Sequence, residues 1–249
     1  MAIVSALCPP ALRRALRYAR AASPRTSPMP TPLQAIMFDV DGVLLDSLPQ
    51  HLQICIDKAR EYGLGGLAVP DAEGMRRKIA GGLRVSPMRN FFLAVGFPPA
   101  QADRAVVDYE REFVQSYRPQ AFAGIGPMLA RLRDAGCTLG LVTANTRSNV
   151  EPALGAALEL FDPRCRFYFD SFAVARSKAW CLQESARVLD VALADCAYVG
   201  DQPADIEAAE VSRMRFLGVT FGWGLTRATH GGVALVDSVD AIAPALLES

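Results

Sequence analysis

The sequence predicts an α/β fold, in which a Rossmann-like parallel sheet forms the core and an all-α cap domain is inserted into it. From Ala35 onward, short apolar runs of strand length alternate with segments of helical spacing. Repeated βα units of this kind build a parallel sheet covered by helices on both faces. Residues 48–119 interrupt the alternation, because they show helical spacing and no convincing strand. We therefore assign residues 34–47 and 120–249 to the core and residues 48–119 to the cap.

The expected elements follow in order along the chain. The apolar run Ala35–Phe38 predicts a short buried strand, and residues 48–62 predict a helix with Leu52, Ile56 and Ala59 on one face. The cap continues with expected helices at residues 71–80, 87–95 and 100–117. The core then resumes with a helix at 125–135, a strand at 138–142, a helix at 147–158, a weaker strand at 167–169, a helix at 178–189, a strand at 197–199, a helix at 203–211, a strand at 216–219 and a helix at 241–247.

Composition excludes several classes of protein. The 249 residues include 26 basic and 26 acidic side chains, and this balance argues against nucleic acid or an anionic membrane as a partner. The six cysteines show neither a CxxC pair nor the spacing of zinc ligands, which is typical of reduced core cysteines in a cytoplasmic protein. No apolar stretch is long enough to span a bilayer. We expect a globular enzyme, monomeric or homodimeric, that acts on a small molecule.

The N-terminal extension, residues 1–33, has a composition of its own. Residues 1–38 contain no Asp or Glu but include five arginines, and a turn-rich segment follows them. We interpret the extension as a disordered basic tail or as the product of an upstream start, with Met29 as the natural first residue. The alternative is an organellar transit peptide, which has a similar composition. The extension is excluded from the predicted fold in either case.

Asp39-Val40-Asp41-Gly42 is the most informative motif, because it places two carboxylates at the end of the first predicted strand. Residues two apart leave a strand on the same side, and open α/β sheets bind ligands at the carboxyl ends of their strands. One carboxylate can attack an electrophile while the other transfers a proton, and their crowded charge calls for a divalent cation. An ordinary Asp-Gly turn is the alternative.

Two further polar segments follow predicted strands, namely Thr143-Ala144-Asn145 and the run from Gly200-Asp201 to Asp205. Because the carboxyl ends of parallel strands converge, these segments are expected beside the first motif. Facing acidic loops suit a hard cation such as Mg²⁺. Taken alone, Asp201 and Asp205 are also explained as a helix N-cap and a first-turn acid.

With these motifs and Lys178 in order, the chain resembles the haloacid dehalogenase-like superfamily, and within it the phosphatase branch. The resemblance covers about Gln34 to the C-terminus. The motifs at Asp39 and at Gly200 are highly specific, whereas those at Thr143 and Lys178 gain force from order and spacing. The resemblance implies a Rossmann-like core with an α-helical cap between the first motif and the second strand.

The resemblance also implies a role for each motif residue. Asp39 would be the nucleophile that forms an aspartyl-phosphate, and Asp41 would protonate the leaving oxygen and then deprotonate water. Thr143 and Lys178 would stabilise the transferring phosphoryl group. The backbone near Ala144 and Asn145 would also bind phosphate. Mg²⁺ would be bound by Asp39, Asp201 and the backbone carbonyl of Asp41. Asp205 would be a further ligand or would hold one of the ligands in place.

One departure concerns the lysine motif. Lys178 precedes Ala179-Trp180, whereas this branch usually has proline after the lysine, so the alignment is least certain over residues 163–177. Asp41 excludes the dehalogenase activity that named the superfamily, because those enzymes lack an acid at that position.

Substrate selection is expected to lie with the cap. Glycines at Gly81-Gly82 permit close backbone approach, and Arg84 offers a charge for a second anionic group, although a solvated surface turn explains them equally well. The segment Phe221-Gly222-Trp223-Gly224 resembles an aromatic-glycine loop of phosphoglycolate phosphatases, or else Trp223 is core packing. These features favour a phosphorylated carboxylic acid or sugar phosphate as substrate.

The principal alternative function is a β-phosphoglucomutase-like isomerase. His51 and Arg84 resemble residues of that enzyme, but no lysine lies between Pro98 and Tyr117, and Gly200-Asp201 replaces its usual Glu-Asp. We therefore rank the hydrolase above the mutase. A non-catalytic phosphate-binding protein ranks last, because it would require a broken first motif.

Overall fold

The computed structural model describes residues 32–248. The interpretation of the N-terminal extension falls on residues 1–31 and so lies outside the described part of the chain. Among the described helices, none combines the length and the hydrophobicity that a membrane span requires.

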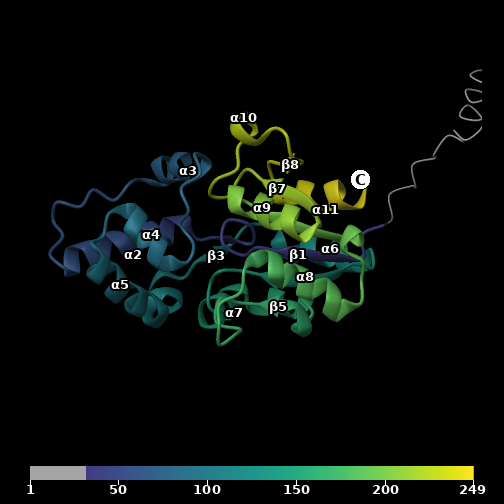
Figure 1. Cartoon of the computed structure of the whole chain (residues 1–249), viewed down its shortest axis with the longest axis horizontal. Coiled ribbons are helices and arrows are strands. Elements are labelled where there is room, and N and C mark those ends of the chain that lie inside the picture. Colours follow the sequence, from purple (N-terminus) through teal and green to yellow (C-terminus); the bar gives the residue numbers. More distant parts are fainter. Residues whose placement is uncertain (1–31, 249) are drawn as a thin grey trace, which may run out of the picture. The chain divides into compact units, whose positions relative to one another are not determined.

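The core is a six-stranded parallel sheet, which confirms the predicted fold class (Figure 1). Every neighbouring pair of its strands is parallel, and the register sets Phe38 opposite both Leu141 and Val199. Asp39, Thr143 and Asp201 each come directly after one of these strands, and the three strands end at nearly the same level of the sheet. In spatial order the strands are β5 (Arg166–Phe167), β4 (Thr138–Val142), β1 (Ala35–Phe38), β6 (Cys196–Gly200), β7 (Arg215–Val219) and β8 (Leu235–Val236).

Strand β1 lies in the middle of the sheet because all four of its side chains are apolar and fully buried. Ile36 and Phe38 face one hydrophobic cluster, while Ala35 and Met37 face another. The first cluster includes residues of α6 (Ile125–Asp134), α7 (Arg147–Leu154) and α11 (Ile242–Leu247), and the second includes residues of α8 (Lys178–Leu189) and α9 (Pro203–Ser212). Helices thus cover both faces of β1, as a continuous apolar strand requires.

The cap consists of helices with a hydrophobic cluster of their own. They are α2 (Leu48–Glu61), α3 (Ala72–Ala80), α4 (Met88–Val95), α5 (Pro99–Glu112) and the π-helix η1 (Phe113–Tyr117). A two-stranded antiparallel ribbon of β2 (Leu45–Asp46) and β3 (Gln120–Ala121) carries the chain into and out of the cap. Trp223 from the core joins the cap cluster.

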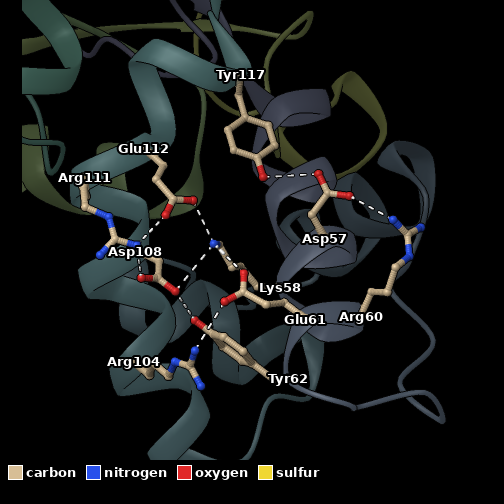
Figure 2. Close-up of polar contacts among 10 residues, drawn as sticks. All are labelled: Asp57, Lys58, Arg60, Glu61, Tyr62, Arg104, Asp108, Arg111, Glu112 and Tyr117. Atoms are coloured by element: carbon tan, nitrogen blue, oxygen red, sulfur yellow. Dashed lines mark hydrogen bonds and ion pairs between the residues drawn. The ribbon is translucent and has the colours of Figure 1, made fainter.

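A polar network joins α2 to α5 inside the cap (Figure 2). Lys58 Nζ lies 2.8 Å from a Glu61 oxygen, 2.7 Å from Glu112 and 3.5 Å from Asp108. The Tyr62 hydroxyl donates a hydrogen bond to Asp108 at 2.5 Å. Since the Lys58 side chain is only 6% exposed, its charge depends on these carboxylates for compensation.

The structure corrects details of the expected helices. Ile56 is 38% exposed, whereas Leu52, Cys55 and Ala59 are buried, so the buried stripe of α2 runs beside Ile56. Helix α7 ends at Leu154 instead of residue 158, because Gly155 has a positive φ of 52° and begins the 3₁₀ helix η2 (Gly155–Leu160).

The weak strand near Tyr168 is also shorter than expected. Strand β5 ends at Phe167, because the Tyr168 amide donates to the Ser171 hydroxyl at 2.8 Å instead of continuing the sheet. Several short elements of two to four residues were not predicted from the sequence. These are β2, β3, β8, α10 (Arg227–His230) and the 3₁₀ turns η3 (Pro163–Cys165), η4 (Leu193–Asp195) and η5 (Val239–Ala241).

Candidate active site

Asp39 and Lys178 form the centre of the candidate site. Asp39 follows β1 and is buried, and Lys178 is the first residue of α8, whose N-terminus is capped by Ser177. Lys178 Nζ donates to Asp39 Oδ2 at 2.5 Å and to Asp205 Oδ1 at 2.6 Å. The side chain therefore reaches the end of β1 even though no proline follows the lysine.

Asp205 supports the site and also caps α9. Its Oδ1 accepts hydrogen bonds from Lys178 and, at 3.0 Å, from the Tyr198 hydroxyl. Its Oδ2 accepts from the backbone amides of Asp201 at 3.1 Å and Gln202 at 3.0 Å. A carboxylate has about four acceptor positions, so these donors leave Asp205 little capacity for a further ligand. The geometry suits a residue that positions Lys178 and the Asp201 loop.

Asp201 differs from Asp205 in having an unpartnered oxygen. Its Oδ2 accepts from the Trp223 amide at 2.6 Å, but its buried Oδ1 has no hydrogen-bond partner among residues 32–248. One oxygen each of Asp39, Asp201 and Asp205 lies within 4.8 Å of the others. Burial and the neighbouring Asp205 and Asp39 charges raise the pKa of Asp201 well above its usual range.

The three buried carboxylates of this cluster are only partly neutralised by the Lys178 ammonium group. Burial raises the pKa of Asp39 to about 7, although the Lys178 charge acts in the opposite direction. Crowded carboxylate oxygens, one of them unpartnered, are what a hard cation such as Mg²⁺ requires. The residues present therefore fit the expected metal, with Asp39 and Asp201 as the best-placed side chains.

Gly42 lets the chain pass closely beside Asp201. It has a φ of +79°, and a Cβ there would lie 2.0 Å from Asp201 Oδ2. Only glycine accommodates both the conformation and the contact. The glycine of the first motif thus has a packing role in addition to its role in the turn.

The Asp41 carboxylate is held away from the acidic cluster. Its Oδ1 accepts from the Ser47 hydroxyl at 2.6 Å, and its Oδ2 accepts from the Asn145 side-chain amide at 2.9 Å. The prediction that Asp41 binds the metal accordingly concerns its backbone carbonyl and not its carboxylate, and it stays a prediction. The two carboxylates of the first motif are oriented by different partners, as different chemical roles require.

Two cap residues complete a ring of hydrogen bonds around Asp41. His51 Nδ1 lies 2.7 Å from the Ser47 carbonyl, and His51 Nε2 lies 3.1 Å from the Tyr109 hydroxyl. The Tyr109 hydroxyl lies 3.2 Å from Asn145 Oδ1, and Asn145 in turn donates to Asp41. Through this ring, the cap contacts the side chain that is expected to act as acid and base.

The tautomer of His51 follows from its neighbours. A carbonyl only accepts, so Nδ1 carries a proton and donates to Ser47. Burial lowers the pKa of His51, although the charge of Asp41 opposes this shift, so the neutral ring with an accepting Nε2 is favoured. Tyr109, which the sequence analysis did not single out, then has one proton to share between His51 and Asn145.

A cavity of about 920 Å³ connects the site to the cap. Its lining includes Asp39, Asp41 and Lys178 together with Thr143, Ala144, Asn145, His51, Gly82 and Arg84, so the predicted residues from both parts of the chain meet there. Thr143 is buried, and its Oγ1 accepts from the Asn145 amide at 3.1 Å. Arg84 instead lies on the surface and forms an ion pair with Glu207 of α9 at 2.6 Å.

The comparison with protein families agrees with this geometry. Residues 33–212 match the model of the haloacid dehalogenase-like hydrolase family, over a segment that contains every predicted motif of the core. The chain belongs to this family. The resemblance seen in the sequence is thereby confirmed, together with its assignment to the phosphatase branch of haloacid dehalogenase-like hydrolases.

Relatives of this hydrolase include both phosphatases and a kinase. The phosphoglycolate phosphatase of Xanthomonas campestris pv. campestris (strain 8004) is 31% identical over 205 residues, which cover 77% of this chain and 85% of that protein. The tyrosine-protein kinase PtkA of Mycobacterium bovis is 32% identical over 220 residues, covering 84% of this chain and 67% of the kinase. The crystal structure of a predicted phosphatase from Clostridium acetobutylicum superposes with a TM-score of 0.70 at 20% identity, covering 88% of this chain and 100% of that one.

Trp223 of the hydrolase links the acidic loop to the cap. Its ring packs against His51 and Phe91, with centroid distances of 4.9 and 5.8 Å, and it also belongs to the lining of the cavity. The side chain thus takes part in core packing, and its resemblance to the loop of phosphoglycolate phosphatases stays a prediction. Its backbone amide nevertheless holds Asp201. No sequence signal identifies this contact, because it comes from the backbone and joins residues 22 positions apart.

Proposed function

We propose that this hydrolase cleaves phosphate monoesters of small metabolites in an Mg²⁺-dependent reaction that passes through an aspartyl-phosphate on Asp39. The observation that carries the proposal is the arrangement of the carboxylates beside the cavity. Asp39 is held by Lys178, Asp41 is held separately by Ser47 and Asn145, and one buried oxygen of Asp201 has no partner within residues 32–248. The named phosphatases among the relatives support the same reaction.

In the first step, an Asp39 oxygen attacks phosphorus, the bond from phosphorus to the ester oxygen breaks, and Asp41 gives a proton to the departing oxygen. In the second step, Asp41 takes a proton from water, the water oxygen bonds to phosphorus, and the bond between phosphorus and the Asp39 oxygen breaks. Inorganic phosphate is released and the Asp39 carboxylate is regenerated. The same group serves as acid and then as base, so no further proton donor is required.

The surrounding residues orient these two carboxylates. Ser47 and Asn145 hold Asp41 from two sides, which fixes the direction in which it presents a proton. Lys178 places a positive charge beside Asp39 and, with the Thr143 hydroxyl, is positioned to contact phosphate oxygens. When Mg²⁺ is bound by Asp39, Asp201 and the Asp41 carbonyl, it supplies positive charge for the phosphoryl group and for the crowded carboxylates.

The substrate, cellular location and oligomeric state are parts of the proposal with different support. A phosphoglycolate-like or sugar-phosphate-like ester agrees with the names of the relatives. Cytoplasmic location agrees with the five free, buried cysteines of the described chain, whereas an organellar location would depend on residues 1–31. A monomer or homodimer stays a prediction.

The decisive experiment uses the full chain with Mg²⁺ and a panel of phosphate monoesters, with released inorganic phosphate as the readout. We expect release from at least one ester, loss of release on chelation, and loss in Asp39→Asn with an unchanged circular dichroism spectrum. Acid-quenched wild type should carry one phosphoryl group on the peptide that contains Asp39. Folded, Mg²⁺-loaded protein that releases no phosphate from any ester would refute the proposal.

The panel also separates the two alternatives. Conversion of a hexose 1-phosphate to the 6-phosphate without net phosphate release would identify the mutase. The two cap lysines disfavour that activity, since Lys58 is paired with Glu61, Glu112 and Asp108 and neither Lys58 nor Lys78 belongs to the described lining of the cavity. Transfer of phosphate from ATP to a tyrosine-containing peptide would identify the activity named for the mycobacterial relative.

A further inference from the structure

The cavity extends from the reacting groups into an apolar region. Its volume of about 920 Å³ falls near the upper end of the range for pockets that hold drug-sized ligands. The reacting end of the lining contains Asp39, Asp41 and Lys178. The cap contributes apolar side chains such as Val85, Met88 and Val106, together with the charged side chains of Arg84, Arg89, Asp103 and Glu110.

Two apolar side chains of the core are exposed at this cavity. Phe169 is 42% exposed and Val211 of α9 is 66% exposed, and both belong to the lining. Apolar side chains that are solvent-exposed and grouped around a cavity mark a surface that a ligand covers. Together with the apolar cap side chains, they form two walls between which the leaving group of a phosphate ester would lie.

The charges on the cap side do not favour a second anionic group. The two arginines that the cap contributes to the lining, within residues 32–248, are already paired: Arg84 with Glu207 at 2.6 Å and Arg89 with Asp103 at 2.5 Å. Arg176, which the core contributes to the lining, lies over the Trp180 ring, 5.0 Å from its centroid. A substrate carboxylate would exchange one exposed ion pair for another, with little net gain. Glu110 adds a further negative charge to the lining.

We propose that the preferred substrates are phosphate monoesters whose leaving group is apolar or aromatic and carries no negative charge of its own. The leaving group extends from Asp39 between the cap wall of Val85, Met88 and Val106 and the core wall of Phe169 and Val211. This inference rests on the proposed hydrolase function, and it departs from the phosphoglycolate-like or sugar-phosphate-like ester that the names of the relatives suggest. It also ranks such esters above phosphorylated carboxylic acids.

A series of alkyl phosphates tests the inference directly. Ethyl, butyl and hexyl phosphate release alcohols of nearly equal acidity, so differences in kcat/KM report contacts of the chain. Full burial of one methylene group raises kcat/KM by up to about fourfold. The value of kcat/KM should therefore rise at least severalfold from ethyl to hexyl phosphate. Isobutyl phosphate, in which an isopropyl group replaces the carboxylate of phosphoglycolate, should be hydrolysed with a higher kcat/KM than phosphoglycolate.

A matched pair of variants locates the effect. Val211→Ser should reduce the dependence of kcat/KM on chain length. Val107→Ser changes another exposed valine, 59% exposed on α5, which is not among the described residues that line the cavity. It should leave the chain-length dependence unchanged.

The outcomes distinguish the two proposals. Phosphate release with the same kcat/KM for ethyl and hexyl phosphate, or with phosphoglycolate preferred over isobutyl phosphate, would overturn the inference and leave the hydrolase standing. An equal change in chain-length dependence for Val211→Ser and Val107→Ser would overturn it as well. Absence of release from every ester would overturn both proposals.

Discussion

Replacing Tyr109 with Phe removes the hydroxyl that joins the cap to the acid/base side of the active site. This hydroxyl lies 3.1 Å from His51 Nε2 and 3.2 Å from Asn145 Oδ1, and Asn145 donates to the Asp41 carboxylate. The ring of Phe fills the same volume, so the substitution tests the hydrogen bonds and leaves the packing against Phe113 in place. It therefore asks whether the cap helps to orient Asp41.

The expected magnitude follows from what each partner loses. Asn145 Oδ1 keeps the Thr146 amide at 2.8 Å and the Asn149 side chain at 3.2 Å, so it stays hydrogen-bonded. His51 Nε2 loses its partner, and one unsatisfied buried acceptor costs about 1–3 kcal/mol of folding free energy. General acid catalysis is worth about 10²–10⁴-fold, and Asp41 retains its direct contacts, so we expect a loss of about tenfold in kcat/KM.

The assay compares an alkyl phosphate with 4-nitrophenyl phosphate. Nitrophenolate departs without protonation, whereas an alkoxide needs the proton from Asp41, so the loss should be concentrated on the alkyl ester. Tyr62→Phe is the matched control, because its hydroxyl contacts Asp108 at 2.5 Å in the cap and lies outside the active-site ring (Figure 2). The comparison uses kcat/KM, because kcat also contains the hydrolysis of the aspartyl-phosphate, in which Asp41 acts on both esters alike. Equal losses of kcat/KM for both esters in Tyr109→Phe would refute the orienting role.

Three further substitutions probe the cap and the metal site. Asp201→Asn should raise the Mg²⁺ concentration for half-maximal activity at least tenfold, and an unchanged Mg²⁺ titration would contradict its role as a ligand. Gly224→Ala brings a Cβ to 2.5 Å from Ile79 Cγ2, so thermal unfolding should show a loss of about 1–3 kcal/mol, and an unchanged Tm would show that the loop can move. Lys58→Met removes the buried ammonium group that Glu61, Asp108 and Glu112 share and leaves them with their exposed arginine partners. The free energy of unfolding should fall by about 1–3 kcal/mol at neutral pH, and an unchanged value would contradict this role. Burial acts to raise the pKa of Asp108, but the Tyr62 hydrogen bond and the Lys58 charge outweigh it and lower the pKa below 3.8. The difference in the free energy of unfolding between wild type and Lys58→Met should therefore shrink as the pH falls below 3.8 and Asp108 becomes protonated.

The core of the site was predictable because it depends on local signals. Short apolar runs identify the strands, and the parallel arrangement of βα units places the residues after them at one edge. Asp39, Thr143 and Asp201 follow β1, β4 and β6 with little intervening chain, so small errors in element boundaries did not separate them. The place of Lys178 in the site was harder to predict from the sequence. Lys178 reaches Asp39 from the first turn of a helix, and the loop before this helix has no clear sequence pattern.

The cap contacts depend on packing and carry no comparable signal. Tyr109 occupies a position that helical spacing explains as ordinary core, and only the docking of α5 brings its hydroxyl to Asn145. For Arg84 the sequence left two roles open, an anion-binding residue and part of a solvated surface turn. Its place in the cavity lining and its ion pair with Glu207 follow from how the cap meets α9.

The sequence by itself determined the fold class, the family and the edge of the sheet where the chemistry lies, because periodicity and strand-end motifs are local. The tertiary structure decided the partners of each carboxylate. Asp205 accepts from four donors, one Asp201 oxygen has no partner in the described part of the chain, and Asp41 turns toward Ser47 and Asn145. The tertiary structure also shaped the apolar cavity, since its walls come from helices that are far apart in the chain and meet only when the cap packs on the core.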